Sequence, residues 1–309
     1  MIELSVHLIT FNNAKHIEAT LQSILSQKVN FDFEIVVGDD CSTDNTLEII
    51  NRYKEKQPAL FNVKKNTSQL GILKNFKATL DRCQGTYIFD IAGDDLFKGE
   101  DTLQKMVDTL KTDESLGFVD SGYDLYLETK NKSVNFDNAH LINISKEAYK
   151  TNILLGKVAP VGVCYNRSFL YKYVDFEKYM HMNVTIEDYP ILVDLVMHTN
   201  FETINESLHI YRVHDASCSH QKRFDRQLFL LNQMHLLFTY FSKKYHISET
   251  IRETFEINHN KQLLYYAGYF EKKDIGKIAF KKIASKNLKD YIHYYASQIP
   301  FFRKLISIF

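Results

Sequence analysis

Two adjacent carboxylates, Asp94 and Asp95, follow a short apolar run in the stretch Thr86–Phe97 (TYIFDIAGDDLF). An apolar run of this length, bounded by Gly93 and the acids, is typical of a buried strand in a parallel sheet. Open α/β sheets bind ligands at the carboxyl ends of their strands, and carboxylate oxygens there suit Mg²⁺ or Mn²⁺ carrying a diphosphate. A surface turn with two solvated acids is the alternative interpretation.

The elements around this stretch predict a parallel sheet with helices on both faces. Apolar runs at 4–9, 34–37, 61–64 and 87–91 alternate with helical stripes of apolar residues, an order typical of α/β folds. Candidate ligand-binding side chains follow three of these strands, namely Thr10, Phe11 and Asn12, then Asp39 and Asp40, then Asp94 and Asp95. Because the carboxyl ends of parallel strands meet at one edge, we expect these side chains to form one site.

Several strings in the chain resemble the family 2 glycosyltransferases. They are LITFNN, EIVVGDDCSTDNT, LGILKNF and AGDDLF, and the resemblance extends to YRVHDASCSH at Tyr211–His220. The resemblance implies a GT-A fold, a Rossmann-like and mostly parallel central sheet flanked by helices. It also implies an inverting transferase that moves a sugar from a nucleoside-diphosphate sugar to an acceptor hydroxyl.

The resemblance implies a nucleotide site made of Thr10, Phe11, Asn12, Asp39, Gly71, Lys74 and Asp94. Asp39 matches the acid that binds the edge of the nucleotide base in this family. Its alternative role is that of a loop acid that caps the next helix. Lys74 follows Gly71 on a predicted helix, where a solvated lysine is the alternative.

The resemblance implies that Asp94, Asp95 and His214 hold Mn²⁺ or Mg²⁺. Ala92 stands where the family's DxD motif has its first acid, so the chain departs from the pattern there. His214 lies where related enzymes place a residue near the diphosphate, and a structural histidine is the alternative. Arg212 could pair with an acid of the site, and His220 lies on the following loop.

A second acid pair, Glu187 and Asp188, precedes an apolar helical stripe at Leu192, Leu195 and Val196. Acids at this point also favour the positive end of the helix dipole, so an acidic helix cap is one interpretation. Within the family pattern the pair looks like the catalytic acids, with Asp188 as the general base that takes the acceptor's proton.

The 309-residue chain has a formal net charge of zero, yet residues 231–309 carry 13 Lys and Arg against 6 Asp and Glu, a net of +7. We predict a glycosyltransferase domain at 1–224 and a helical region at 225–309. The basic and aromatic end favours an anionic neighbour such as a membrane surface, with packing on the protein as the alternative. Four scattered cysteines, the lack of a signal peptide pattern and the lack of a long apolar run predict a cytoplasmic protein. If its basic end binds a membrane, we expect the protein to be peripheral on the inner face of the plasma membrane.

The sequence thus predicts a bacterial enzyme of surface polysaccharide synthesis. Its expected partners are a UDP-sugar donor and a saccharide or lipid-linked saccharide acceptor, with no nucleic acid. Two other classes stay open. A sugar nucleotidyltransferase has a related fold, although LITFNN lacks the Gly-rich basic loop of that class. A catalytically impaired nucleotide-sugar-binding protein is compatible with Ala92.

Overall fold

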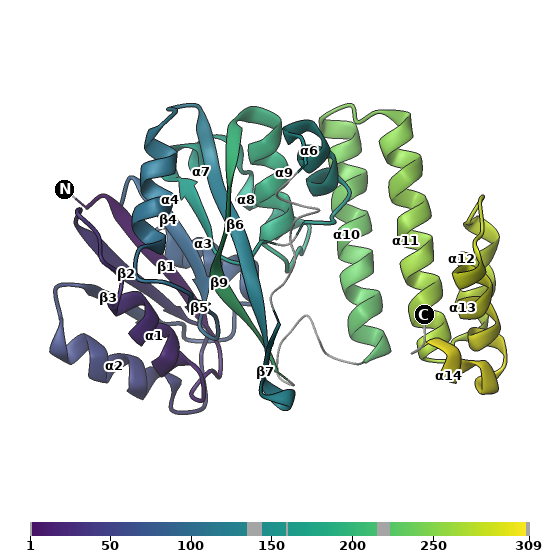
Figure 1. The fold of residues 1–309 in the computed structure, drawn as a ribbon, viewed down its shortest axis with the longest axis horizontal. Helices are drawn as coiled ribbons and strands as arrows, with labels where there is room; N and C mark the ends of the chain where they lie inside the picture. Colours follow the sequence, from purple (N-terminus) through teal and green to yellow (C-terminus); the bar gives the residue numbers. More distant parts are fainter. Residues whose placement is uncertain (1, 135–143, 159, 215–222, 307–309) are drawn as a thin grey trace. The chain divides into compact units, whose positions relative to one another are not determined.

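The computed structural model describes residues 2–134, 144–158, 160–214 and 223–306. The chain divides into two compact units, one made of Met1–Ile153 with Lys157–Asp215 and the other of Leu154–Gly156 with Ala216–Phe309. The first unit contains the sheet, and the second is helical (Figure 1).

The first unit is built on a mixed sheet whose strand order is β3-β2-β1-β4-β8-β6-β9-β5, with β7 beside β6. The four strands β1 (Leu4–Thr10), β2 (Phe33–Asp39), β3 (Phe61–Lys65) and β4 (Tyr87–Ala92) are parallel. Beyond β4, β8 (Val163–Asn166) is antiparallel to both β4 and β6 (Leu116–Leu127), and β9 (Asn200–Val213) runs parallel to β6. The short strands β5 (Leu96–Phe97) and β7 (Lys132–Val134) pair antiparallel with β9 and β6.

The register of the central strands sets where the site can form. Thr10 at the end of β1 pairs with Asp39 at the end of β2, and Ile9 pairs with Ala92 at the end of β4. Three carboxyl ends are therefore level, and the residues that follow them share one edge of the sheet.

Helices cover the sheet because their apolar stripes match its two faces. On one face, Leu4, Val6 and Leu8 of β1 share a core with apolar residues of α1 (Ile17–Leu25), α2 (Thr46–Lys56) and α4 (Thr102–Lys111). On the other face lies α3 (Ile72–Leu80), whose predicted stripe Leu73, Phe76 and Leu80 is buried. Among the described residues, α6 (Lys146–Leu154), α7 (Arg167–Tyr173), α8 (Phe176–His181) and α9 (Asp188–His198) follow, with Leu154 at the end of α6 assigned to the second unit.

The second unit consists of helices packed around α11 (Glu249–Tyr269), as Figure 1 shows. Its neighbours are α10 (Phe224–Lys244), α12 (Lys273–Lys282), α13 (Leu288–Gln298) and α14 (Arg303–Ile306). Phe238 of α10 stacks on Phe255 of α11 with ring centroids 3.7 Å apart, and Leu264, Ala279 and Ile283 form a small core. Among the described residues, no helix has both the length and the apolarity that crossing a membrane requires.

Gly38 allows α3 to pack closely against the end of β2. A Cβ added at Gly38 would lie 1.9 Å from Thr79 Oγ1. We expect Gly38→Ala to lower the free energy of unfolding by about 1–3 kcal/mol, the usual cost of overpacking. Urea unfolding followed by circular dichroism measures this loss.

The double variant Gly38→Ala/Thr79→Ala is the matched test, because it removes the clashing oxygen. We expect a double-mutant cycle to show a favourable interaction energy between the two changes. A Gly38→Ala protein as stable as wild type would contradict this account of the packing.

Candidate active site

Asp39 is buried at the end of β2 with one oxygen unused. Its Oδ1 accepts a hydrogen bond from the Ser42 amide at 2.9 Å, while its Oδ2 is buried and has no hydrogen-bond partner among the described residues. Leaving a buried acceptor unsatisfied costs about 1–3 kcal/mol, so this oxygen is available to a donor group that a ligand would bring. The level end of β1 places Thr10 beside Asp39, and the ring of Phe11 that follows is 39% exposed.

Asn12 braces the loops that follow β1 and β2. It adopts a positive φ of 52°. Its backbone N–H donates to Ser42 Oγ at 2.9 Å, and its side-chain Oδ1 accepts from the backbone N–H of Thr43 at 2.8 Å. The structure therefore places Asn12 between the loops that follow β1 and β2, with its side-chain oxygen already bonded.

Asp40 shapes the neighbouring loop, a role that sequence reasoning missed. Its two carboxylate oxygens accept from the amides of Leu70 and Gly71 at 2.7 and 2.9 Å and from Asn66 Nδ2 at 3.0 Å. Gly71 has a φ of +83°, which favours glycine, and precedes α3. Lys74 lies on α3 and is exposed.

Asp94 and Asp95 differ in environment although they are adjacent. Asp95 is buried and accepts from the Arg212 amide at 3.0 Å. Burial, reinforced by the charge of Asp94, raises its pKa well above the usual range. Asp94 is more exposed, and its Oδ2 lies 2.9 Å from His214 Nε2. The backbone oxygen of Asp94 accepts from Arg212 Nε at 3.0 Å. Asp95 thus anchors the end of β9, and Asp94 with His214 faces the site.

Glu128 joins the segment after β1 to the end of β9, a connection that sequence reasoning also missed. It lies on a 3₁₀ turn after β6 and accepts from Lys15 Nζ at 2.9 Å and from His16 Nε2 at 3.1 Å, and these bonds lower its pKa. Arg212 Nη1 approaches it at 3.8 Å. The rings of His16 and His214 are 4.4 Å apart. The partners are more than 80 residues from Glu128 along the chain, so local patterns give no signal for them.

The acid pair Glu187 and Asp188 lies at the start of α9, and both side chains are half-buried. Asp188 Oδ1 accepts from the amide of Tyr189 at 2.6 Å. Removal from water raises the pKa of both carboxyls; the charge of Asp188 raises that of Glu187 further, and the charge of Asp90 on β4 raises both. Carboxyls with raised pKa values are typical of groups that exchange protons in catalysis. His220 lies outside the described residues.

The donor set at Asp94 fits a divalent ion that takes most of its ligands from elsewhere. Among the described residues, no group of three or more His, Cys, Asp or Glu side chains is arranged to hold a metal. Mg²⁺ bound to a nucleotide typically uses one or two carboxylates, with phosphate oxygens and water as the remaining ligands. The more exposed carboxylate of Asp94, with His214 beside it, meets that requirement.

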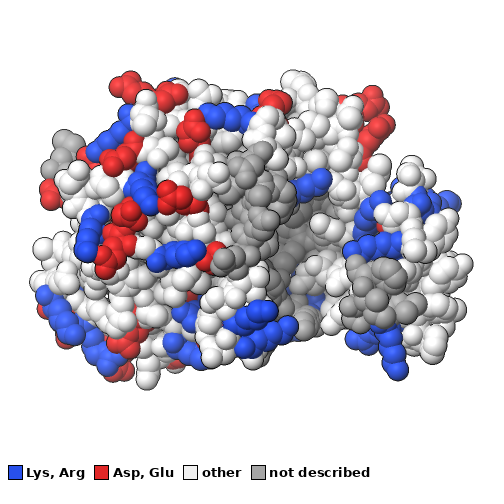
Figure 2. All heavy atoms as spheres, in the orientation of Figure 1, with Lys and Arg blue, Asp and Glu red and all other residues white. Residues whose placement is uncertain are grey.

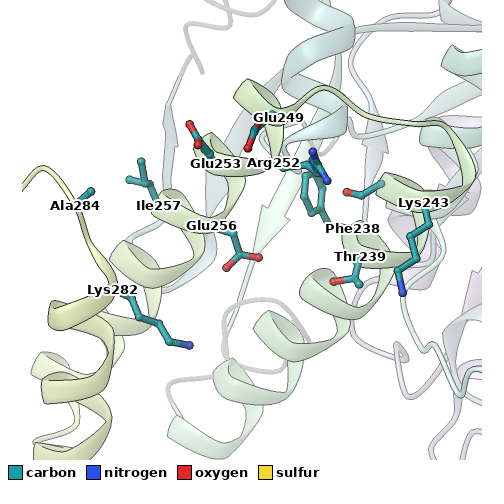
Figure 3. A pocket seen from close by; sticks show the side chains of 11 residues that line it. Phe238, Thr239, Lys243, Glu249, Arg252, Glu253, Glu256, Ile257, Lys282 and Ala284 are labelled. Carbon is teal, nitrogen blue, oxygen red and sulfur yellow. The ribbon is translucent and has the colours of Figure 1, made fainter.

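The helical unit has a pocket of its own, whose lining differs from the acid-rich site described above. Its volume is about 680 Å³, and it is lined by residues of α10 and α11 with Lys282 and Ala284 (Figure 3). Figure 3 shows both acids and bases around it, including Glu249, Glu253, Arg252 and Lys243. Mixed exposed charges of this kind define no ligand chemistry.

Comparison with known proteins agrees with this geometry. The family model for glycosyl transferase family 2 matches residues 5–176. Abequosyltransferase RfbV of Salmonella typhimurium is 28% identical over 53% of this chain and 49% of its own length. The poly(ribitol-phosphate) beta-N-acetylglucosaminyltransferase TarS of Staphylococcus aureus is 32% identical over 44% of this chain and 22% of its own. A Mycobacterium tuberculosis protein matches over 30% of its own length. The match therefore spans less than a third of the length of TarS and of this protein.

Solved structures show the same fold. Residues 1–349 of TarS in complex with UDP-GlcNAc match with a TM-score of 0.57 and 16% identity, over 99% of this chain and 91% of that one. The mannosyltransferase PcManGT of Pyrobaculum calidifontis, in complex with GDP-Man and Mn²⁺, matches with a TM-score of 0.62 and 16% identity, over 99% and 86%. The fold is GT-A, with additional C-terminal helices, and the prediction of fold class is confirmed. Since the family model covers more than half of its residues, the chain belongs to glycosyl transferase family 2.

Proposed function

We propose that the chain is an inverting glycosyltransferase that moves a sugar from a nucleoside-diphosphate sugar to an acceptor hydroxyl. The observation that supports this most is the unused, buried oxygen of Asp39, at the same edge of the sheet as the end of β4, which Asp94 follows. Asp39 Oδ2 would accept the ring N–H of a uracil or guanine base, and Phe11 would contact the base. A nucleotide bound there extends its diphosphate toward Asp94.

Asp188 is the proposed general base. Its carboxylate takes the proton of the acceptor hydroxyl as the acceptor oxygen bonds to the anomeric carbon. The bond from that carbon to the diphosphate oxygen breaks, and its electron pair leaves with the nucleoside diphosphate. A divalent cation held by Asp94 and His214 would stabilise the charge of the leaving group. A single displacement of this kind inverts the anomeric configuration.

The donor and acceptor are proposed by analogy with the relatives. The name of TarS gives N-acetylglucosamine as the transferred sugar and poly(ribitol-phosphate) as the acceptor, and its structure contains UDP-GlcNAc. By analogy, we propose a UDP-sugar donor and a polysaccharide or lipid-linked saccharide acceptor for this chain. Ala92 supports one competitor, a binding protein without turnover. Release of nucleoside diphosphate from a panel of nucleotide sugars separates the two, because a pure binder releases none.

We further propose that the helical unit docks on an anionic membrane surface, which would place the enzyme at the cytoplasmic face. Leu288, Tyr291, Tyr295 and Ile299 recur at helical spacing on and just after α13 and are exposed. Phe301, which follows them, is 77% exposed. On the face shown in Figure 2, the charged side chains around α12 to α14 are mainly Lys and Arg. Exposed apolar side chains beside basic ones are the composition of interfacial helices.

Asp188→Asn tests the catalytic base. The amide can still accept from the Tyr189 amide, so we expect a melting temperature near wild type and unchanged nucleotide binding. The transfer rate should fall by roughly 10²–10⁴-fold, the usual contribution of a general base. A variant with near-normal transfer would remove Asp188 from the mechanism and point to Glu187.

The pH profile gives an independent check. Asp188 acts only when deprotonated, and its pKa is raised by burial and by Asp90. The value of kcat/KM should therefore fall as the pH decreases through that raised pKa, above the usual carboxyl value of about 4. Stopped measurements from pH 4 to 8 with the donor saturating measure this limb. A rate that stays flat down to pH 4 would contradict the assignment.

Asp94→Ala tests the metal site. We expect calorimetry to show that Mn²⁺ no longer strengthens donor binding, while the fold and the weak metal-free binding persist. Wild-type protein in EDTA is the matched control and should resemble the variant in Mn²⁺. Equal Mn²⁺-dependent affinity in both proteins would exclude Asp94 as a ligand.

Leu288→Ser/Phe301→Ser tests membrane docking, because both side chains are largely exposed. Sedimentation with vesicles containing phosphatidylglycerol should show binding reduced by about tenfold or more, since each apolar side chain buried contributes about 1.5–3 kcal/mol. Phe229→Ser, at an exposed position of α10, is the control and should bind as wild type does. Equal vesicle binding by the double variant and the wild type would contradict membrane docking and favour packing of this basic, aromatic end on the protein.

A further inference from the structure

Asp90 is a charged residue in the middle of β4, where its neighbours Ile88, Phe89 and Ile91 are buried and apolar. Its side chain remains 22% exposed. A carboxylate in a central strand is costly to bury without partners, so its retention there requires a reason beyond packing.

His7 holds one oxygen of this carboxylate. The two residues are level on β1 and β4, and Nδ1 of His7 lies 2.7 Å from Oδ1 of Asp90. His7 is fully buried, and its Nε2 donates to the carbonyl oxygen of Phe76 on α3 at 2.9 Å. Since a carbonyl oxygen and a carboxylate oxygen can only accept, both ring nitrogens of His7 donate, Nε2 to Phe76 and Nδ1 to Asp90. The orientation of Asp90 is thus set by a chain of two hydrogen bonds, and no contact with a described residue engages its Oδ2.

Ala92 presents only a methyl group between Asp90 and the carboxyl end of β4. Alternate residues of a strand face the same side, so Asp90 and Ala92 share a face, and Asp90 lies roughly 6–7 Å further from the edge. Ala92 is the position where the DxD motif of the family has an acid. In this chain the methyl group of Ala92 stands there, and the next carboxylate on that face is Asp90.

Asp90 also lies within electrostatic reach of both halves of the site. On the diphosphate side, burial and the charge of Asp94 are the main causes of the raised pKa of Asp95, and the charge of Asp90 adds to them. On the acceptor side, burial is the main cause of the raised pKa of Asp188, and the charge of Asp90 again adds to it. The transferred sugar must lie between the diphosphate and the general base.

We propose that Asp90, oriented by His7, accepts a hydrogen bond from a hydroxyl of the transferred sugar and so determines which donor the enzyme uses. This inference rests on the proposed function. A carboxylate with one fixed and one free oxygen suits a sugar hydroxyl, because a charged acceptor forms a stronger hydrogen bond than a neutral one. A site built for a hydroxyl also rejects sugars that lack it, since the buried acceptor would be left unpaired.

The test compares a nucleotide sugar with its free nucleoside diphosphate. The probe is whichever of UDP-glucose, UDP-galactose, UDP-GlcNAc and GDP-mannose raises the melting temperature of the wild-type protein most. Calorimetry in Mn²⁺ then gives the affinity of each variant for that sugar nucleotide and for UDP or GDP alone. A role limited to structure would alter both affinities or neither.

We expect Asp90→Asn to bind the nucleotide sugar about tenfold more weakly and the nucleoside diphosphate as wild type does, because only the sugar contact is lost. The amide oxygen of asparagine can still accept from His7 Nδ1–H, which preserves the packing, while its NH₂ group replaces the free oxygen. Ala92→Val is a second variant, which adds bulk between Asp90 and the carboxyl end of β4 and leaves the pair of His7 and Asp90 intact. It should show the same selective loss.

Glu34→Gln is the matched control. Glu34 is a buried strand acid that accepts from Ser5 Oγ, at the opposite end of β2 from Asp39. It should change neither affinity. Unchanged sugar binding in both site variants, or an equal loss for both ligands, would overturn the inference alone. If the wild-type protein binds none of the four donors, the proposed function fails and the inference with it.

Discussion

The hydrogen-bonded register of β1 between β2 and β4 is the constraint on which the rest of the site depends. It makes the ends of three parallel strands level, so that Thr10, Asp39 and the turn after Ala92 meet at one edge. A shift by one residue would reverse every side chain between the two faces and separate these groups. The shift is prevented by the core on one face, where Val6 and Leu8 of β1 lie against the helices.

Concentrating carboxylates at one edge is unfavourable unless each has partners, and the structure supplies them unequally. Asp40 is saturated by backbone amides and Asn66, and Asp95 is held by the end of β9. The oxygens left over lie on Asp39, on Asp94 and on Asp90. The acids that are satisfied build the walls, and those with spare oxygens are the ones we assign to ligands.

Local patterns were sufficient for the four parallel strands and for the edge where they end, whereas β9 and the short strands β5 and β7 were not predicted. The stripe of α3 and the run that forms β4 have the periodicity expected of their elements, and the order of strands and helices indicated the parallel half of the sheet. The roles of the individual site residues stay predictions. The links of Glu128 to His16 and Arg212, and of His7 to Asp90, depend on residues that meet only after the sheet has formed. A sequence period reports the neighbours within an element, and it carries no information about which polar groups from distant elements will pair.

The central claim is that this edge binds a nucleotide through the unused oxygen of Asp39. Its most direct test is calorimetric titration of UDP and GDP into the wild-type protein and the variant Asp39→Asn in Mn²⁺. Asparagine keeps an oxygen for the Ser42 amide and presents an NH₂ group to the base N–H. Two facing donors should weaken the preferred nucleotide by about tenfold or more, since an unsatisfied buried polar group costs about 1–3 kcal/mol. Equal affinity of the two proteins, or a wild-type protein that binds neither nucleotide, would contradict the account.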